Sequence, residues 1–376
     1  MKILIAGDYC DRYRVTDCIR NKEYAKMFDG IKHLVHSFDF AVLNFEFPIV
    51  KTKGLPIVKS GPNLKGQPSS IDAIKYAGFN VCTLANNHIL DQGEQCCLDT
   101  ENLLEKAGIK TVGIGTNLKE ASNILYLSKD GLVLAIVNCA EHEFSYATEN
   151  SAGANPINPI RQYHQIQEAK NKADYVIVIT HGGHEHFNLP SPRMKELYRF
   201  FIEVGADAVV NHHQHCISGY EVYNGKPIFY GLGNLLFDNP TFRETFWNKG
   251  YMVELDLHDG SIDFEILPYT QCNEEPVVEL LNEEQKIQFA KEVEELNRII
   301  GDDAILMSMV DEYYKKNIKN ELDILEPYRG RVLNKLLDLG LLPHLISGSK
   351  VPSILNHVNC ESHRDKLVYA LTQKNK

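Results

Sequence analysis

The chain has 376 residues, of which 44% are hydrophobic and 24% are charged, values that are ordinary for a soluble globular protein. This length suits one large domain plus an addition rather than a single small core. The formal net charge of -11 argues against broad, non-specific nucleic-acid binding, so no nucleic acid is expected as a partner. A local cationic pocket is compatible with this overall negative charge.

The beginning of the chain carries an apolar run of only four residues, Ile3 to Ala6. This run is too short for the core of a signal peptide, and no window approaches the roughly 18 apolar residues of a membrane-spanning helix. We therefore expect a cytoplasmic location and no membrane segment. The nine cysteines are scattered and form no CxxC pair, which predicts reduced, buried thiols.

The first two thirds of the chain alternate between strand-like and helix-like patterns. Short, continuous apolar runs predict strands at 2–8, 40–46, 79–88, 132–139, 173–183 and 206–213. Helical patterns lie between them at 70–78, 94–108 and 191–205, and each ends in a glycine that is typical of a helix C-terminus. This alternation predicts an α/β layered domain in which helices cover a sheet.

The pattern changes after Asn211. Asn-Gly and Asp-Gly pairs divide 219–231 and 251–269 into two strand-like halves each, which predicts two hairpins. From Asn282 onward the chain is rich in Glu, Lys, Leu and Ile at helical spacing, and 282–300 is the clearest amphipathic helix. We therefore expect a domain over 1–270 and a helical subdomain over 282–376.

Polar side chains follow the predicted strands at the points where the apolar runs end. They are Asp8, Glu46, Asn87, His88, His181, His212, His213 and His215. Side chains just beyond the carboxyl ends of strands in an α/β sheet converge in one crevice. Carboxylates and imidazoles together suit divalent ions such as Mn, Fe or Zn. The pattern therefore predicts a metal site at these strand ends.

Each of these residues has a simpler interpretation when it is taken alone. Asp8 fits a turn or a helix cap, and Asn87 with His88 fits a helix N-terminus. His181 fits a hydrogen-bonded core histidine, and 211–215 fits a solvated loop. Because five such polar residues or groups all fall at the ends of predicted strands, the metal site is favoured over these separate interpretations.

Five motifs in the chain resemble those of the CapA family of poly-gamma-glutamate capsule-synthesis proteins. They are "GD" at 7–8, "NFEFPI" at 44–49, "LANNHILDQG" at 84–93, "HGGHE" at 181–185 and the run from "NHHQH" to "GLGNLLFD" at 211–238. The order and composition of all five match, and the resemblance covers roughly 1–268. The helical region from Asn282 lies outside it.

The resemblance implies a fold, a metal centre and a set of site residues. Because this family is similar to calcineurin-like metallophosphoesterases, we expect a four-layer α/β/β/α sandwich with a C-terminal helical extension and two divalent metal ions, Mn, Fe or Zn. The implied metal ligands are Asp8, Glu46, Asn87, His181, His213 and His215. Catalytic roles are implied for His88 and Asp8, and the choice between His212 and His213 as ligand stays open.

The chain departs from the family pattern at four positions. Gly182 stands where the family has an aromatic residue, Asn211 and Gln214 replace glycine and proline, and Gly231 replaces serine. These changes spare the implied ligands and leave the substrate preference open.

Further residues are candidates for the pocket wall, and a role in loops or behind the ligands is an equal alternative. They are His184, Glu185, His186 and Tyr220, with Glu141 and His142 as another pair at a strand end.

Three functions are compatible with this resemblance. The first is a metal-dependent hydrolase, a phosphoesterase whose two metals activate a water to attack a small-molecule or polymeric anionic substrate in capsule, polysaccharide or polyglutamate metabolism. The second is a poly-gamma-glutamate synthesis or export factor, or an enzyme that cleaves γ-glutamyl bonds. The third is a non-catalytic, metal-containing binding protein. The sequence leaves the substrate, the metals and the oligomeric state open.

Overall fold

The computed structural model describes residues 1–326, 328, 330–346, 348, 350–359, 363, 367–368 and 370–371. Contacts divide the chain into two units, Met1–Met307 and Ser308–Lys376. This division does not test the predicted domain ranges, 1–270 and 282–376, which stay a prediction.

The larger sheet of the first unit has eight strands in the order β16-β15-β14-β1-β2-β3-β4, and β13 pairs with β1 beside this path. The strands are β1 (Lys2–Tyr9), β2 (Phe40–Phe45), β3 (Val81–Thr83), β4 (Lys110–Val112), β13 (Asn234–Leu236), β14 (Lys249–His258), β15 (Ser261–Gln271) and β16 (Val278–Leu280). Strands β1 to β4 run parallel, whereas β14 to β16 run antiparallel to their neighbours. The carboxyl ends of β1, β2 and β3 therefore lie at one edge of the sheet.

The smaller sheet has six strands in the order β11-β12-β10-β9-β7-β6. They are β6 (Leu125–Lys129), β7 (Leu132–Ala140), β9 (Tyr175–His181), β10 (Ala208–His212), β11 (Tyr220–Tyr223) and β12 (Lys226–Phe229). Strands β7, β9, β10 and β12 are parallel. A separate two-stranded sheet joins β5 (Ile114–Gly115) to β8 (Gly153–Ala154).

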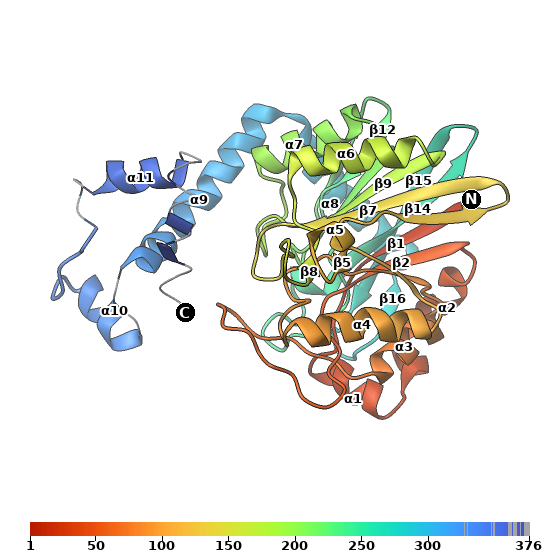
Figure 1. Cartoon of the computed structure of the whole chain (residues 1–376), viewed down its shortest axis with the longest axis horizontal. Coiled ribbons are helices and arrows are strands. Elements are labelled where there is room, and N and C mark those ends of the chain that lie inside the picture. The colour runs from red at the N-terminus through yellow and green to blue at the C-terminus, as the bar shows by residue number, and fades with distance from the viewer. Residues whose placement is uncertain are drawn as a thin grey trace. The chain divides into compact units, whose positions relative to one another are not determined.

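Helices cover the outer face of each large sheet, as Figure 1 shows for the first unit. On the larger sheet these are α1 (Arg14–Arg20), α2 (Tyr24–Val35), α3 (Ser69–Ala77) and α4 (Glu94–Lys106). On the smaller sheet they are α6 (Pro159–Lys170) and α7 (Pro192–Glu203). The short elements α5 (Leu118–Ala121) and η1 (Phe246–Asn248) lie in connections. The predicted four-layer α/β/β/α arrangement is confirmed.

A buried apolar layer joins the two sheets face to face. It includes Ile5 of β1 and Val253 of β14 from the larger sheet, and Ile136 of β7, Ile177 of β9 and Val210 of β10 from the smaller one, none of which is measurably exposed. Because side chains alternate along a strand, the same strands present their other faces to the covering helices. This packing fixes the two sheets against each other and aligns their parallel strand ends.

Most predicted elements of the first unit appear with small changes at their ends. Both hairpins are present, as β11–β12 and β14–β15. Gly78 has a φ of 104° at the C-terminus of α3, a conformation that a glycine adopts without strain. The strand predicted over 79–88 was wrong in length, because β3 ends at Thr83 and 87–90 form a turn.

The described C-terminal part of the chain is mainly helical, as predicted. Asn282 caps α8 (Glu283–Gly301) by accepting a hydrogen bond from the backbone N–H of Gln285. The later helices are α9 (Asp303–Leu325), α10 (Arg331–Asp338) and α11 (Val351–Asn359). Among the described helices, none combines the length and the apolar character that crossing a membrane requires.

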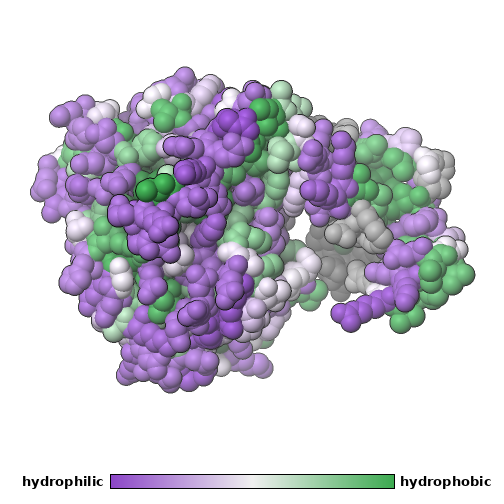
Figure 2. Space-filling view, turned by 180° about the vertical axis from the view of Figure 1, so that it is seen from behind, coloured by the Kyte–Doolittle hydropathy of each residue, from purple (hydrophilic) through white to green (hydrophobic). Residues whose placement is uncertain are grey.

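The surface and the cysteines of the first unit match those of a globular domain. The face shown in Figure 2 is predominantly hydrophilic, with apolar residues scattered among polar ones. The eight cysteines in the described ranges are buried and unpaired, as predicted, while Cys360 lies outside those ranges.

Candidate metal centre

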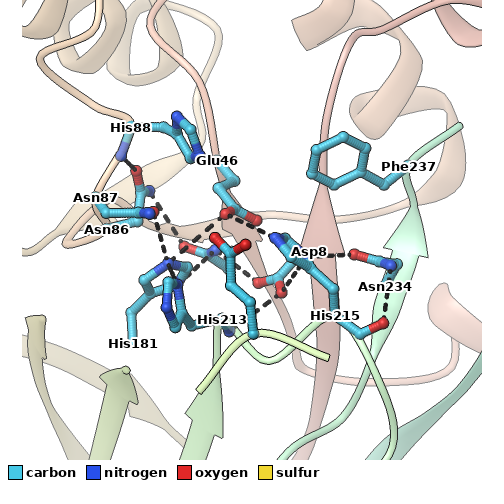
Figure 3. A network of polar contacts seen from close by, with 12 residues as sticks. Asp8, Glu46, Asn86, Asn87, His88, His181, His213, His215, Asn234 and Phe237 are labelled. Carbon is cyan, nitrogen blue, oxygen red and sulfur yellow. Dashed lines mark hydrogen bonds and ion pairs between the residues drawn. The ribbon is translucent and has the colours of Figure 1, made fainter. Parts of the chain in front are cut away.

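Five side chains from strand ends of both sheets face one another in the first unit (Figure 3). Asp8 lies in β1 and Glu46 directly follows β2, whereas His181 ends β9, and His213 and His215 follow β10. None of the five is more than 5% exposed. The two-sheet packing thus brings residues that are more than 200 positions apart in the sequence into one buried cluster.

These side chains form two groups that can each hold a metal ion. One group is Glu46, His181 and His213, and the other is Asp8, Glu46 and His215. In each group, one ligand atom from every residue lies within 4.8 Å of the others. Glu46 belongs to both groups, so the two groups share its carboxylate.

Glu46 has the environment of a carboxylate that needs a cation. Its side chain is fully buried, and neither Oε1 nor Oε2 has a hydrogen-bond partner. Burial, followed by the nearby charge of Asp8, raises the pKa of Glu46 well above its ordinary value. A buried carboxylate without hydrogen bonds is costly in its ionised form, and divalent ions remove that cost. The residues therefore fit a metal centre.

His181 is surrounded by other potential ligand atoms. Its Nε2 lies 3.0 Å from Asn87 Oδ1, 3.1 Å from His213 Nδ1 and 3.6 Å from Glu46 Oε1. Atoms that each bind one ion at about 2.1 Å lie about 3.0–3.4 Å from one another. Burial and then the neighbouring histidines hold the pKa of His181 well below its ordinary value. The imidazole is therefore neutral at pH 7, the form that binds metals.

His215 and Asp8 are both held by hydrogen bonds, and His215 keeps its second ring nitrogen near Glu46. His215 Nδ1 lies 2.9 Å from Asn234 Oδ1, and its Nε2 lies 3.7 Å from Glu46 Oε1. Asp8 accepts hydrogen bonds from Asn44 Nδ2 at 2.7 Å and from the backbone N–H of His213 at 3.2 Å. Contacts of this kind orient metal ligands and select the tautomer of a histidine.

The chain between the two histidines is locally strained. His213 has a φ of 96° and His215 a φ of 54°, which are uncommon for residues other than glycine. Such conformations persist only where the surroundings enforce them, and they cluster at functional sites. Both imidazoles have a ring nitrogen within 4.8 Å of a Glu46 oxygen.

His212, which the sequence left as an alternative to His213, is directed elsewhere. Its Nε2 lies 2.9 Å from the backbone carbonyl of Ala6, and it belongs to neither ligand group. The assignment of individual ligands stays a prediction.

His88 forms a buried cluster with two residues that the sequence did not assign to the site. Its Nδ1 lies 2.6 Å from Asp91 Oδ2 and 3.0 Å from Lys59 Nζ, while Lys59 also contacts Asp91 Oδ1 at 2.5 Å. The Lys59 side chain is only 2% exposed. Burial lowers the pKa of His88, although the contact with Asp91 acts in the opposite direction.

A cavity of about 330 Å³ opens beside this cluster. Its volume lies near the lower end of the range for small-molecule sites, about 300–1,000 Å³. The lining includes residues of the site and of the surrounding loops: Arg12, Lys59, Asn87, His88, Glu143, Glu185, His186, His215, Phe242 and Trp247. Glu185 and His186, which were candidates for the pocket wall with a role in loops as an equal alternative, belong to this lining.

The other candidates for the pocket wall lie outside this cavity. Tyr220 packs its ring against Phe229 and Phe264, and Glu141 pairs with Arg193. His142 contacts the ring of Tyr146, and His184 is absent from the cavity lining.

Sequence reasoning missed several residues that position the site. Asn44 and Asn234 lie inside quoted motifs but were given no role, so their motif membership was an available signal. Lys59 lies in an irregular segment with no periodicity, and its position became visible only in the structure.

Comparisons with known proteins identify relatives of the chain. The family model described as "Bacterial capsule synthesis protein PGA_cap" matches residues 2–239. A capsule biosynthesis protein CapA of Bacillus anthracis is 30% identical over 277 residues, 71% of this chain and 67% of that protein. A PGA biosynthesis protein CapA of Bacillus subtilis is 34% identical over 266 residues, 70% of this chain and 69% of that protein.

Among solved structures, a 5'-nucleotidase from Candida albicans is similar at a TM-score of 0.40. It is 12% identical, and the match covers 71% of this chain and 50% of that one. This likeness is distant.

Proposed function

We propose a metal-dependent hydrolase function for this chain, which belongs to the bacterial capsule synthesis protein family. The family inferred from the five sequence motifs is therefore confirmed. The activity that fits the site best is phosphoester hydrolysis with two divalent ions, on an anionic substrate of capsule or polyglutamate metabolism.

The observation that carries the proposal is the position of Glu46. Its two carboxylate oxygens are buried without hydrogen bonds, and they lie between two groups of imidazole and carboxylate ligands. One ion would be held by Glu46, His181 and His213 with Asn87, and the other by Asp8, Glu46 and His215. Divalent ions in such a site lower the pKa of a bound water and polarise a phosphoryl or carbonyl oxygen.

His88 is the residue of this chain that is suited to transfer a proton. It lines the cavity, and its Nδ1 faces both Asp91, an acceptor, and Lys59, a donor. When the ring is protonated on both nitrogens, Nδ1–H donates to Asp91 and Nε2 carries the proton that can be given to a leaving oxygen, which returns His88 to the neutral form. Asp8 serves as ligand and completes the catalytic pair with His88.

The experiment is a turnover assay with metal-stripped and reloaded protein. Hydrolysis of p-nitrophenyl phosphate and bis(p-nitrophenyl) phosphate should appear only after reloading with Mn, Fe or Zn, and Asp8→Asn should abolish it. Asp17→Asn is the matched control, because Asp17 lies in an exposed surface pair with Arg20. Equal turnover by stripped protein, or full turnover by Asp8→Asn, would contradict the proposal.

A second candidate, cleavage of γ-glutamyl bonds, is favoured by the similarity to the PGA biosynthesis protein CapA of Bacillus subtilis. The same centre suits it, since a metal polarises an amide carbonyl as well as a phosphoryl group. Release of p-nitroaniline from γ-glutamyl-p-nitroanilide, with no phosphoester turnover, would select this activity. Metal binding without either turnover would select a synthesis or export factor, or a non-catalytic binding protein.

A further inference from the structure

Arg12 lies on the wall of the cavity that His88 and His215 also line. It is partly buried, and its guanidinium lies 4.7 Å from the ring centroid of Tyr13, to whose hydroxyl it donates a hydrogen bond of 3.0 Å. Within the described part of the chain, no carboxylate lies within 4.0 Å of this guanidinium to neutralise it. Arg12 is therefore a positive charge that the fold itself leaves uncompensated beside the site.

The segment that carries Arg12 is anchored and strained. Tyr13 has a φ of 53°, a conformation that a tyrosine keeps only when its surroundings enforce it. The next residue, Arg14, supplies the anchor, because its Nε and Nη2 bind the two oxygens of the buried Asp238 at 2.9 and 2.7 Å. Arg14 is therefore paired with a carboxylate, whereas Arg12, two positions earlier, lines the cavity.

The other charged groups in the cavity wall have partners. Lys59 pairs with Asp91, Glu143 accepts a hydrogen bond from Asn87, and Glu185 lies 3.8 Å from His186. Arg12 is the cation of this wall that lacks a carboxylate partner among the described residues. A guanidinium in this state binds carboxylates and phosphates through paired hydrogen bonds.

We propose that Arg12 binds a second anionic group of the substrate, a carboxylate or a phosphate, beside the group that reacts at the metal centre. The substrate class is therefore a molecule with at least two negative charges. This inference rests on the proposed hydrolase function, which defines the group that reacts at the metal centre. Anion binding by Arg12 itself can be measured without turnover. The net charge of -11 repels anions in general, so a local cation is needed to hold such a substrate.

The first test compares substrates that differ by one charge. With metal-loaded wild type, kcat/KM for 4-carboxyphenyl phosphate should exceed that for phenyl phosphate by about tenfold or more, as one charge-assisted hydrogen bond supplies. 1,4-Phenylene bisphosphate tests a phosphate at the same place. In Arg12→Ala, kcat/KM for each of these two substrates should come close to that for phenyl phosphate, and Arg12→Lys should keep part of the difference. Arg20→Ala, a change at an exposed arginine of α1, should leave the difference as in wild type.

The second test removes turnover from the question. Calorimetry on metal-loaded protein measures the binding of 4-carboxyphenylphosphonate against phenylphosphonate, two analogues that hydrolases cannot cleave at the phosphorus. Stronger binding of the carboxylated analogue by wild type, lost in Arg12→Ala, supports the inference even if no hydrolysis is ever seen. Equal binding of the two analogues, or binding of neither, overturns it, whether or not the hydrolase proposal stands.

Discussion

The floor of the site and its rim are built in different ways. The floor, defined as Asp8, Glu46, His181, His213 and His215, lies at strand ends and is at most 5% exposed. The rim, defined as Arg12, Glu143, Glu185 and His186, lies in loops. The side chains of Glu143, Glu185 and His186 are 42%, 45% and 34% exposed. The difference teaches that packing of the two sheets positions the candidate metal ligands, whereas loops supply these four residues of the cavity wall.

The largest effect is expected from a change of one atom in the floor. Glu46→Gln removes the charge shared by both ligand groups, so metal-dependent hydrolysis should fall by more than about 100-fold. Loss of a residue that merely orients a ligand already costs about 10- to 100-fold. Steady-state turnover of reloaded protein measures this, with Glu185→Gln as the matched change in the rim. Similar losses in the two variants would erase the distinction between floor and rim.

The Arg14–Asp238 pair fixes the start of α1, next to the rim residue Arg12, and its loss should affect stability. Asp238 is fully buried and Arg14 is 26% exposed, so Asp238→Asn should lower the free energy of unfolding by about 3 kcal/mol at pH 7. Chemical denaturation measures this, and Asp17→Asn in an exposed pair should change stability by less than about 1 kcal/mol.

The same pair predicts a pH dependence. Burial by itself raises the pKa of Asp238, but hydrogen bonds from Arg14 and Arg243 more than offset it, so the pKa is lowered from its ordinary value of 3.8. A lowered carboxyl pKa stabilises the fold above 3.8, and this contribution is lost as the pH falls through the lowered pKa. The difference in stability between wild type and Asp238→Asn should therefore shrink below pH 4. A constant difference from pH 7 to pH 2 would contradict this ion pair.

A residue behind the floor should have an intermediate effect. Asn234 Oδ1 accepts a hydrogen bond from His215 Nδ1–H and thereby orients that ring. Asn234→Ala should therefore weaken metal affinity by about 10- to 100-fold. Competition with a chromogenic chelator measures the affinity, and Asn239→Ala, at a position in the cavity wall, is the comparison. An unchanged affinity in Asn234→Ala would mean that packing alone orients His215.

The smallest effect is expected in the rim. Glu143 accepts a hydrogen bond of 2.9 Å from Asn87 Nδ2, and the amide oxygen introduced by Glu143→Gln can accept the same bond. Hydrolysis should therefore change by less than about threefold, since the exposed carboxylate interacts weakly through solvent. A loss of 100-fold or more would place Glu143 among the residues of the floor.

The difference between strand ends and loops also explains which site residues could be predicted from the sequence. Asp8, Glu46 and His181 were identifiable in the sequence because each ends a continuous apolar run, and parallel strands bring such ends together. Asn44, inside β2, binds Asp8, but no periodicity marks an asparagine in a strand as functional. Lys59 and Arg12 lie in irregular segments, whose course is set by tertiary contacts such as Arg14 with Asp238. The strand predicted over 79–88 was too long because its apolar run continues into the turn that carries Asn87.

The most direct test of the two-ion centre is metal content by mass spectrometry after reconstitution and gel filtration. Wild type should retain close to two ions per chain. His181→Ala and His215→Ala should each retain close to one, because each removes a ligand from a different group, and Glu46→Gln should retain fewer than either. Wild type that retains no metal, or histidine variants that both keep the full wild-type content, would contradict a centre in which Glu46 joins two ions.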